Sequence, residues 1–247
     1  MKETKDIFSN QSDYYAKYRP VYPEELYNFI FSQVREFGTA WDCGTGNGQV
    51  AGVLSEKFEK VYATDISLNQ LQKAVPKDNI TYVHARAERV PMQDQSVDLI
   101  TVAQAIHWFD FNAFYEEVRR VAKPSALLAV WGYGLLSISP KLDPIIEDFY
   151  SDTLGAYWDS ERNYLDESYR TIPFPFEEIA TPYFTMQKEW SLSEFLGYLS
   201  SWSSVQHYIK ANEVSPVDEL EKKLQPYWET DEVKPVSFPV FMRIGKV

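Results

Sequence analysis

The chain has 247 residues and a formal charge of −12, from 24 Lys and Arg against 36 Asp and Glu. Hydrophobic residues make up 45% of it and aromatic residues 16%, which is enough to fill the core of one α/β sheet with an appended lid and excludes wholesale disorder. Because an acidic chain with no block of basic residues is repelled by phosphate groups, we expect neither nucleic acid nor a membrane surface as a partner.

The predicted elements begin with a helix from Pro23 to about Gly38, where apolar residues recur at helical spacing. From residue 39 onward, strands and helices alternate. Strands are predicted at residues 39–42, 60–64, 80–83, 97–103 and 125–131, and helices at residues 49–59, after a Ser67 cap, and at residues 111–122. Alternation of this kind is typical of a doubly wound parallel sheet.

The pattern changes after Tyr133, where prolines and aromatic residues become frequent and the alternation stops. We interpret this part as an aromatic-rich lid with helices near residues 192–199 and 217–224, and with strands at residues 182–190 and 236–244 that close the sheet. One domain over residues 1–247 is expected. Its parts are an N-terminal segment and helix at 1–38, a cofactor-binding core at 39–135, and the lid with the closing strands at 136–247.

Three alternating glycines follow the first strand of this core. Gly44, Gly46 and Gly48 lie between Asp42 and the next helix, and Asp65 ends the following strand. Glycine permits positive φ and lets a ligand approach the backbone, while the amides at a helix start can donate to that ligand. A carboxylate at the end of the second strand is placed to accept ribose hydroxyls. The pattern predicts a nucleoside site, and a tight turn that binds nothing is the alternative.

Two classes of nucleoside cofactor fit this loop. Gly46, Gly48 and Ala51 match a variant of the dinucleotide fingerprint, so the glycine spacing by itself does not exclude a nicotinamide cofactor. The Asp42 carboxylate, however, repels a pyrophosphate and attracts the ammonium and sulfonium groups of S-adenosylmethionine. We therefore favour a cationic cofactor without phosphate.

Class I S-adenosylmethionine-dependent methyltransferases have a first motif that resembles residues 42–48, DCGTGNG. Their adenine-side loop and fourth strand are similar to residues 87–99, and the segment that follows in members acting on small molecules resembles residues 103–109, AQAIHWF. A looser similarity, in residues 18–20 and 201–206, is to the branch of trans-aconitate methyltransferase-like and embryo-abundant-like proteins.

This resemblance implies a Rossmann-like sheet of seven strands whose last strand is antiparallel, and it implies a set of cofactor contacts. The residues that would hold S-adenosylmethionine, and release S-adenosylhomocysteine, are Arg19 at the methionine carboxylate, Asp42, Gly44, Thr45 and Gly46 in the loop, Asp65 at the ribose, Ala87 at the adenine edge and Gln104 at the methionine side. Many relatives have Asp where this chain has Arg86, so a side-chain contact from that position to adenine is in question. Arg19 alternatively pairs with Glu24 or Glu25.

Histidine and arginine side chains supply the candidates for chemistry on the acceptor. His107 follows the fourth strand, at the mouth of the expected site, and would act as general base for a hydroxyl or amine acceptor, whereas a carboxylate acceptor needs no base. The alternative is a structural histidine beside Trp108 under the lid. Arg162 and Arg170 would clamp an acidic group or instead pair with neighbouring carboxylates. Trp108, Arg162, Arg170 and Trp202 are the expected substrate contacts, with Trp202 in an apolar wall.

These features predict a methyltransferase that acts on a small molecule. One alternative is a macromolecule methyltransferase, although residues 103–106 (AQAI) differ from the Asn-Pro-Pro-Tyr-like segment used on extruded bases. The other is a nicotinamide-dependent oxidoreductase or a nonenzymatic nucleotide binder. The single cysteine, Cys43, leaves no disulfide or zinc cluster, and residues 1–10 lack the apolar region of a signal peptide. We therefore expect a cytoplasmic enzyme without a metal.

Overall fold

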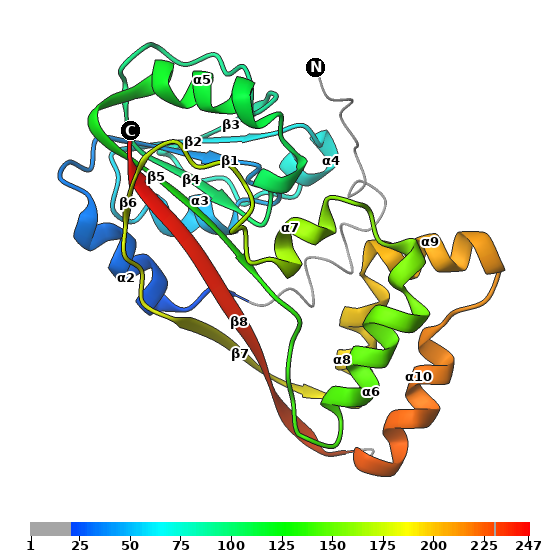
Figure 1. The fold of residues 1–247 in the computed structure, drawn as a ribbon. Helices are drawn as coiled ribbons and strands as arrows, with labels where there is room; N and C mark the ends of the chain where they lie inside the picture. Colours follow the sequence, from blue (N-terminus) through cyan, green and yellow to red (C-terminus); the bar gives the residue numbers. More distant parts are fainter. Residues whose placement is uncertain (1–20, 230) are drawn as a thin grey trace.

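A mixed sheet forms the centre of the fold (Figure 1). The computed structural model describes residues 21–229 and 231–247. The strand order is β3-β2-β1-β4-β5-β8-β6, and β7 also pairs with β8. The strands are β1 (Thr39–Cys43), β2 (Lys60–Asp65), β3 (Ile80–His84), β4 (Val97–Ala103), β5 (Ala122–Tyr133), β6 (Glu177–Ile179), β7 (Phe184–Ser191) and β8 (Val233–Lys246). Strands β1 to β5 are parallel and β8 is antiparallel to β5, which confirms the expected Rossmann-like sheet.

The edge beyond β8 is divided between two strands. Ile179 pairs with Ile244, and Phe184 pairs with Val240, so β6 and β7 lie one after the other along the same side of β8. Pro182 lies between them and cannot donate to a ladder, which explains the interruption. Eight strands in the described residues therefore occupy seven positions of the sheet. The short strand β6 was not predicted from the sequence, whereas β7 and β8 correspond to the two expected closing strands.

Helices cover both faces of the parallel strands, and this accounts for the continuous apolar runs within them. One buried cluster joins Leu26 and Ile30 to Val61, and a second joins Phe114 and Val118 on the opposite face to strands β4 and β5. The covering helices are α2 (Glu24–Gln33), α3 (Gln49–Leu54), α4 (Leu68–Leu71) and α5 (Phe111–Val121). The carboxyl ends of the parallel strands thus remain as the place where loops can build a site.

The lid consists mainly of short helices gathered at the far ends of the long strands β7 and β8, away from α5 (Figure 1). Its helices are α6 (Asp143–Asp148), η2 (Phe149–Thr153), η3 (Gly155–Tyr157), α7 (Arg162–Asp166), α8 (Leu192–Ser200), α9 (Ser203–Asn212), α10 (Val217–Leu224) and η4 (Gln225–Tyr227). Ser191 ends β7 and begins α8, because its side chain and Glu194 form a capping box. Aromatic rings from several of these helices pack together, among them Tyr150, Trp158 and Trp202.

Element boundaries differ from the predictions in a few places. The first helix ends at Gln33 rather than near Gly38, because Val34 is extended. Helix α3 ends at Leu54 rather than at residue 59. The Ser67 cap is confirmed, since its side chain accepts from the Gln70 amide. Helices α6, α7 and α9 were not predicted. Among the helices of the described residues, none is long and apolar enough to cross a membrane.

Candidate active site

The turn from β1 into α3 has the backbone conformation that its glycines predict. Gly44, Gly46 and Gly48 have φ values of +69°, +57° and +83°. The loop packs closely on two sides: a Cβ on Gly44 would lie 2.6 Å from the Ala105 Cβ, and one on Gly48 would lie 2.5 Å from the Tyr82 hydroxyl. These two glycines are therefore needed for the fold as well as for any ligand.

Gly46 is different, because a Cβ built on it meets no atom within 4 Å. The residue faces open space, so its lack of a side chain is not explained by packing within the described chain. Its amide donates to Asp65 Oδ2 at 2.8 Å, and the amide of Ser67 donates to Asp65 Oδ1 at 2.8 Å. Asp65 thus joins the ends of β1 and β2 and keeps a carboxylate beside the open space.

Asp42 lies beneath the loop and is 1% exposed. One of its oxygens, Oδ2, accepts from Thr45 Oγ1 at 2.5 Å and from the Ala51 amide at 3.1 Å, and the other accepts from Thr101 Oγ1 at 2.8 Å. Burial raises the pKa of the Asp42 carboxyl to about 6, although all three hydrogen bonds act in the opposite direction, and the nearby Asp65 raises it further. Among the described residues, no cationic side chain pairs with Asp42, and the contacts that its carboxylate makes there are these three hydrogen bonds.

The loop after β3 carries Ala87, which is 6% exposed. It is held from α5, where Glu117 accepts from the Val90 amide at 2.7 Å and Arg120 donates to the Val90 carbonyl at 3.0 Å. Sequence reasoning missed Glu117 and Arg120. Their signal was an Arg three residues after a Glu on a helix, a pattern that many solvated helices share. Arg86 pairs with Glu88, with Nε and Oε2 3.1 Å apart.

The segment after β4 brings three further residues to the carboxyl end of the sheet. Gln104 has φ of +55°, and its Oε1 accepts from the Tyr133 amide at 3.0 Å. His107, which is 3% exposed, lies in a short 3₁₀ turn η1 (Ile106–Trp108) with its ring centroid 4.9 Å from that of Trp108. Five consecutive residues, 104–108, therefore supply an amide, an imidazole and an indole side chain.

A pocket lies between this segment and the lid, and it encloses about 860 Å³ of space not filled by protein atoms, part of it open to solvent. Its sheet side includes Gln104, His107 and Trp108, and its lid side includes Arg162 and Trp202. The remaining lining residues are Tyr133, Gly134, Leu135, Leu136, Trp158, Asp159, Leu165, Tyr198, Ser201 and Ser203. The structure thus brings together the predicted catalytic residue and three of the four predicted substrate contacts.

Arg162 is the lining residue with a guanidinium group, and its side chain is 17% exposed. Its Nε donates to the Tyr150 hydroxyl at 2.8 Å and lies 3.6 Å from Asp166 Oδ1, while its guanidinium carbon lies 4.8 Å from the Trp158 ring centroid. These contacts hold one edge and one face of the group. Within the described part of the chain, its terminal nitrogens Nη1 and Nη2 make no hydrogen bond. They are donors that an anion in the pocket would satisfy.

Other candidates lie elsewhere. Arg170 is exposed, its Nε donates to the Glu167 carbonyl at 3.1 Å, and it is not among the residues that line the pocket. Of the two arginines expected to contact the substrate, the pocket therefore includes Arg162 and not Arg170. Arg19 lies outside the described residues. No group of three or more His, Cys, Asp or Glu side chains placed to hold a metal occurs in the described ranges.

The fold is an α/β sheet with a glycine loop between β1 and α3, and comparison with known proteins shows the family to which the chain belongs. A family model described as a methyltransferase domain matches residues 41–130. A Dictyostelium discoideum protein named as a proposed methyltransferase is 37% identical over 249 aligned positions, which cover 98% of this chain and 95% of that protein.

A solved structure of a proposed type II methyltransferase from Anaeromyxobacter dehalogenans is 36% identical, with a TM-score of 0.86 over 92% of this chain and 97% of that chain. A malonyl-[acyl-carrier protein] O-methyltransferase from Marinomonas sp. is 36% identical over 126 residues, covering 48% of this chain and 46% of that protein. The chain belongs to the class I S-adenosylmethionine-dependent methyltransferases.

The residues of the site fit this cofactor. The space in front of Gly46 admits a ligand against the backbone, and the Asp65 carboxylate lies beside that space. The buried Asp42 charge, which lacks a cationic partner among the described residues, complements a ligand that carries a positive charge. An anionic pyrophosphate would instead be repelled by both carboxylates.

Proposed function

We propose that this methyltransferase acts on a small, partly apolar molecule that carries an anionic group. The observation that supports it most is that one pocket is lined both by Gln104, at the predicted methionine side of the cofactor site, and by Arg162 and Trp202 of the lid. A molecule between these residues would have its acceptor atom near the cofactor and its body against aromatic rings.

The dimensions of the pocket support a small acceptor. The pocket is lined by Gln104, which follows β4, and by residues of the lid, and the aromatic side chains of Trp108, Trp158 and Tyr198 are part of its lining. A folded polymer would have to displace these packed rings to reach Gln104. The apolar side chains of this lining also reduce the contact of a reactive methyl donor with water.

The charge of the pocket supports an anionic group on the acceptor. Arg162 offers Nη1 and Nη2, and packing against Trp158 fixes the plane of the guanidinium group. A planar fork of this kind matches a carboxylate with two parallel hydrogen bonds. The formal charge of −12 on the whole chain disfavours an acidic ligand. The positive charge of Arg162 counters this repulsion inside the pocket.

The residues of this chain would act by binding and orientation. S-adenosylmethionine, when bound, supplies a methyl carbon that its positive sulfur makes electrophilic. Asp42 and Asp65 would hold the charged and ribose ends of that cofactor, Ala87 would border the adenine, and Gln104 would border the methionine side. Arg162 would then hold the acceptor atom in line with the methyl group, which is the positioning that in-line transfer requires. The Marinomonas relative is named as an O-methyltransferase of malonyl-[acyl-carrier protein], and this name supports an oxygen acceptor.

A panel of small carboxylic acids, alcohols and amines, offered with S-adenosylmethionine carrying a labelled methyl group, tests this function. We expect acids to be labelled with turnover. Arg162→Met should raise KM for an acid by about tenfold or more, because two charged hydrogen bonds are lost, while the exposed Arg170→Met should leave KM unchanged. Equal KM values for wild type and Arg162→Met would show that the anionic group is bound elsewhere.

A further inference from the structure

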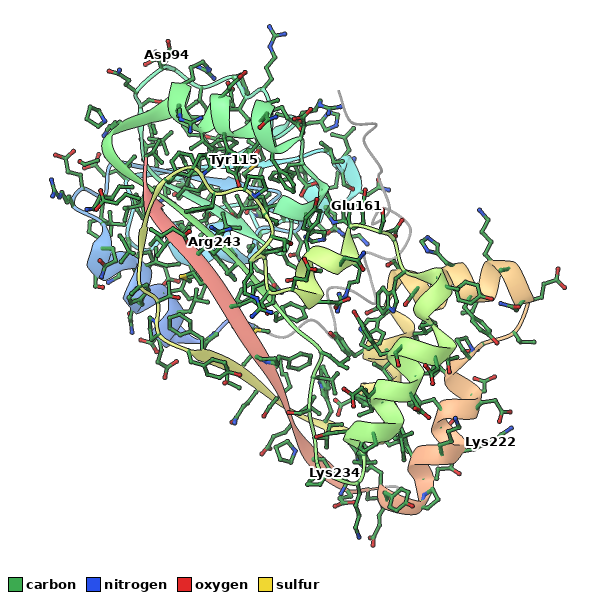
Figure 2. The ribbon with its side chains drawn as sticks, viewed as in Figure 1. Asp94, Tyr115, Glu161, Lys222, Lys234 and Arg243 are labelled. Atoms are coloured by element: carbon green, nitrogen blue, oxygen red, sulfur yellow. The ribbon has the colours of Figure 1, made fainter. Side chains whose placement is uncertain are left out.

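Arg162 reaches the pocket from α7, beside two aromatic rings and a carboxylate of the lid. Its guanidinium carbon lies 4.8 Å from the Trp158 ring centroid and 5.3 Å from that of Tyr150. Asp166 follows about one turn later on the same helix. Glu161, labelled in Figure 2, marks the start of α7 between the sheet and the lid helices. These neighbours decide which donors of Arg162 remain for a ligand.

A tyrosine hydroxyl lies between the guanidinium group and this carboxylate. Arg162 Nε donates to the Tyr150 hydroxyl at 2.8 Å, and the hydroxyl donates to Asp166 Oδ1 at 2.5 Å. The two hydrogen bonds have one possible direction, because a guanidinium group cannot accept and an ionised carboxylate cannot donate. Burial raises the pKa of the Tyr150 hydroxyl to about 12, so at neutral pH the hydroxyl keeps the proton that it donates.

The two charged groups do not form a direct hydrogen bond. Arg162 Nε lies 3.6 Å from Asp166 Oδ1, which is too long for one. Residues four apart on a helix are neighbours that commonly form ion pairs, and an arginine offers a carboxylate two parallel N–H groups. The Tyr150 hydroxyl takes the place of that contact. In the described part of the chain, Nη1 and Nη2 of Arg162 are therefore not used by Asp166.

Local structure holds the tyrosine in this position. Tyr150 lies in the π-helical turn η2, in which the Leu154 amide donates to the Phe149 carbonyl at 3.0 Å. Turns of this kind are rare and are frequent at functional sites. The Tyr150 carbonyl accepts from the Trp158 indole at 3.1 Å, and the Trp202 ring packs edge-on against the Tyr150 ring with centroids 5.9 Å apart. Contacts to backbone and ring thus fix the place of the hydroxyl.

We propose that Tyr150 is a positioning residue that keeps Arg162 available to the acceptor by separating it from Asp166. The hydroxyl satisfies Nε and occupies one oxygen of the carboxylate, so Asp166 does not take up Nη1 and Nη2. These two donors are left for an anionic group in the pocket, which can accept from both in parallel. The inference rests on the proposed function, because it assumes that the acceptor carries the anionic group.

Crystal structures of the wild type and of Tyr150→Phe test the separation without any substrate. Phe keeps the ring that packs against Trp158 and Trp202 but has no hydroxyl. We expect Arg162 and Asp166 to move together in the variant and to form direct hydrogen bonds of about 2.8 Å through Nη1 or Nη2. If the guanidinium group kept its place and no direct contact formed, the proposal would be overturned.

Kinetics with the best acid from the panel test the effect on binding. Tyr150→Phe should raise KM for the acid about tenfold and change kcat by less than about twofold, because the acid then competes with Asp166 for the guanidinium group. Adding Asp166→Asn to Tyr150→Phe should return KM to within about threefold of the wild-type value, since Asn has no charge with which to compete. If Tyr150 only supported the packing of the lid, KM would stay high in the double variant, and this result would refute the proposal.

Tyr157→Phe is the matched control. Tyr157 lies in η3 of the same lid, and its hydroxyl accepts from the Asn212 side chain at 2.8 Å. This variant loses a hydrogen-bonded tyrosine hydroxyl without touching Arg162, so its KM should match the wild type. If it raised KM as much as Tyr150→Phe does, the role of Tyr150 would be structural. If no small acid is methylated, the proposed function fails, and the crystal structures still decide whether Tyr150 separates Arg162 from Asp166.

Discussion

Replacing Asp42 by Asn should stabilise the cofactor-free protein and at the same time weaken cofactor binding. Asn has the same shape, and its oxygen can accept from Thr45 and from the Ala51 amide as Oδ2 does. The carboxyl group of Asp42, in contrast, has to lose its proton in a buried environment. Its pKa is about 6 in the folded chain against an ordinary 3.8, a difference of roughly 2 units. At 1.36 kcal/mol per unit, ionised Asp42 costs the folded state about 3 kcal/mol.

The sign of this effect fixes its pH dependence. A carboxyl group whose folded pKa is raised binds its proton more tightly when folded, so stability falls as pH rises between about 4 and 6 and stays low above that range. Urea unfolding should therefore show Asp42→Asn more stable than wild type by up to about 3 kcal/mol at neutral pH, with no difference below about pH 4. Calorimetry should show S-adenosylmethionine bound about tenfold more weakly by the variant, because the buried counter-charge is gone.

Asp98→Asn is the control with the opposite sign. Asp98 is 7% exposed, but it accepts from Lys123 Nζ at 2.8 and 2.9 Å and from the Thr39 amide at 2.8 Å. Loss of this buried pair should destabilise the protein by about 1 to 3 kcal/mol. If Asp42→Asn destabilised the protein in the same way, the carboxylate would be favourably held in the free protein, and its role as the charge complement of the cofactor would be refuted.

Two further substitutions test the loop, and one tests the α5 contacts behind it. Gly46→Val should abolish binding of S-adenosylhomocysteine in calorimetry while the fold survives, because its side chain enters open space at a strain of about 1 to 2 kcal/mol for φ of +57°; normal binding would mean that the space is not the cofactor site. Asp65→Ala should weaken the same ligand by roughly 1 to 3 kcal/mol, and an unchanged affinity would remove Asp65 from the ribose. Arg120→Met should weaken adenosine binding more than methionine binding, since it frees the Val90 carbonyl from α5; equal losses would contradict that assignment.

Much of the sheet was predictable because its signals are local. The parallel strands are buried on both faces, so their sequences are continuous apolar runs. The glycine loop is recognisable because its backbone needs positive φ, which glycine adopts readily. The limits of α2 and α3 were wrong by several residues because helices end where tertiary contacts stop supporting them. Helices α6, α7 and α9 were missed because an aromatic-rich lid packs on most sides and leaves no clean helical period.

The site was predictable only in part, for a related reason. Gln104, His107 and Trp108 follow a recognisable strand, and the structure places them together as expected. The roles of Asp42, Gly44, Thr45 and the other cofactor residues stay predictions, as does the similarity to the trans-aconitate methyltransferase-like branch. The hydrogen bond of Arg162 to Tyr150 joins residues 12 positions apart and had no signal in the sequence. The sequence did not distinguish Arg162 from Arg170, because only tertiary structure decides which of the two side chains lines the pocket.

The destination of the transferred methyl group is the most direct test of what this enzyme does. A cell extract is incubated with the protein and S-adenosylmethionine labelled in its methyl group, and label is measured in the ultrafiltrate and in the retained protein and nucleic acid. Label should appear in small molecules of the ultrafiltrate, and Arg162→Met should reduce it. Label confined to protein, DNA or RNA, with none in any small molecule, would contradict the proposal that the pocket under the lid receives the acceptor.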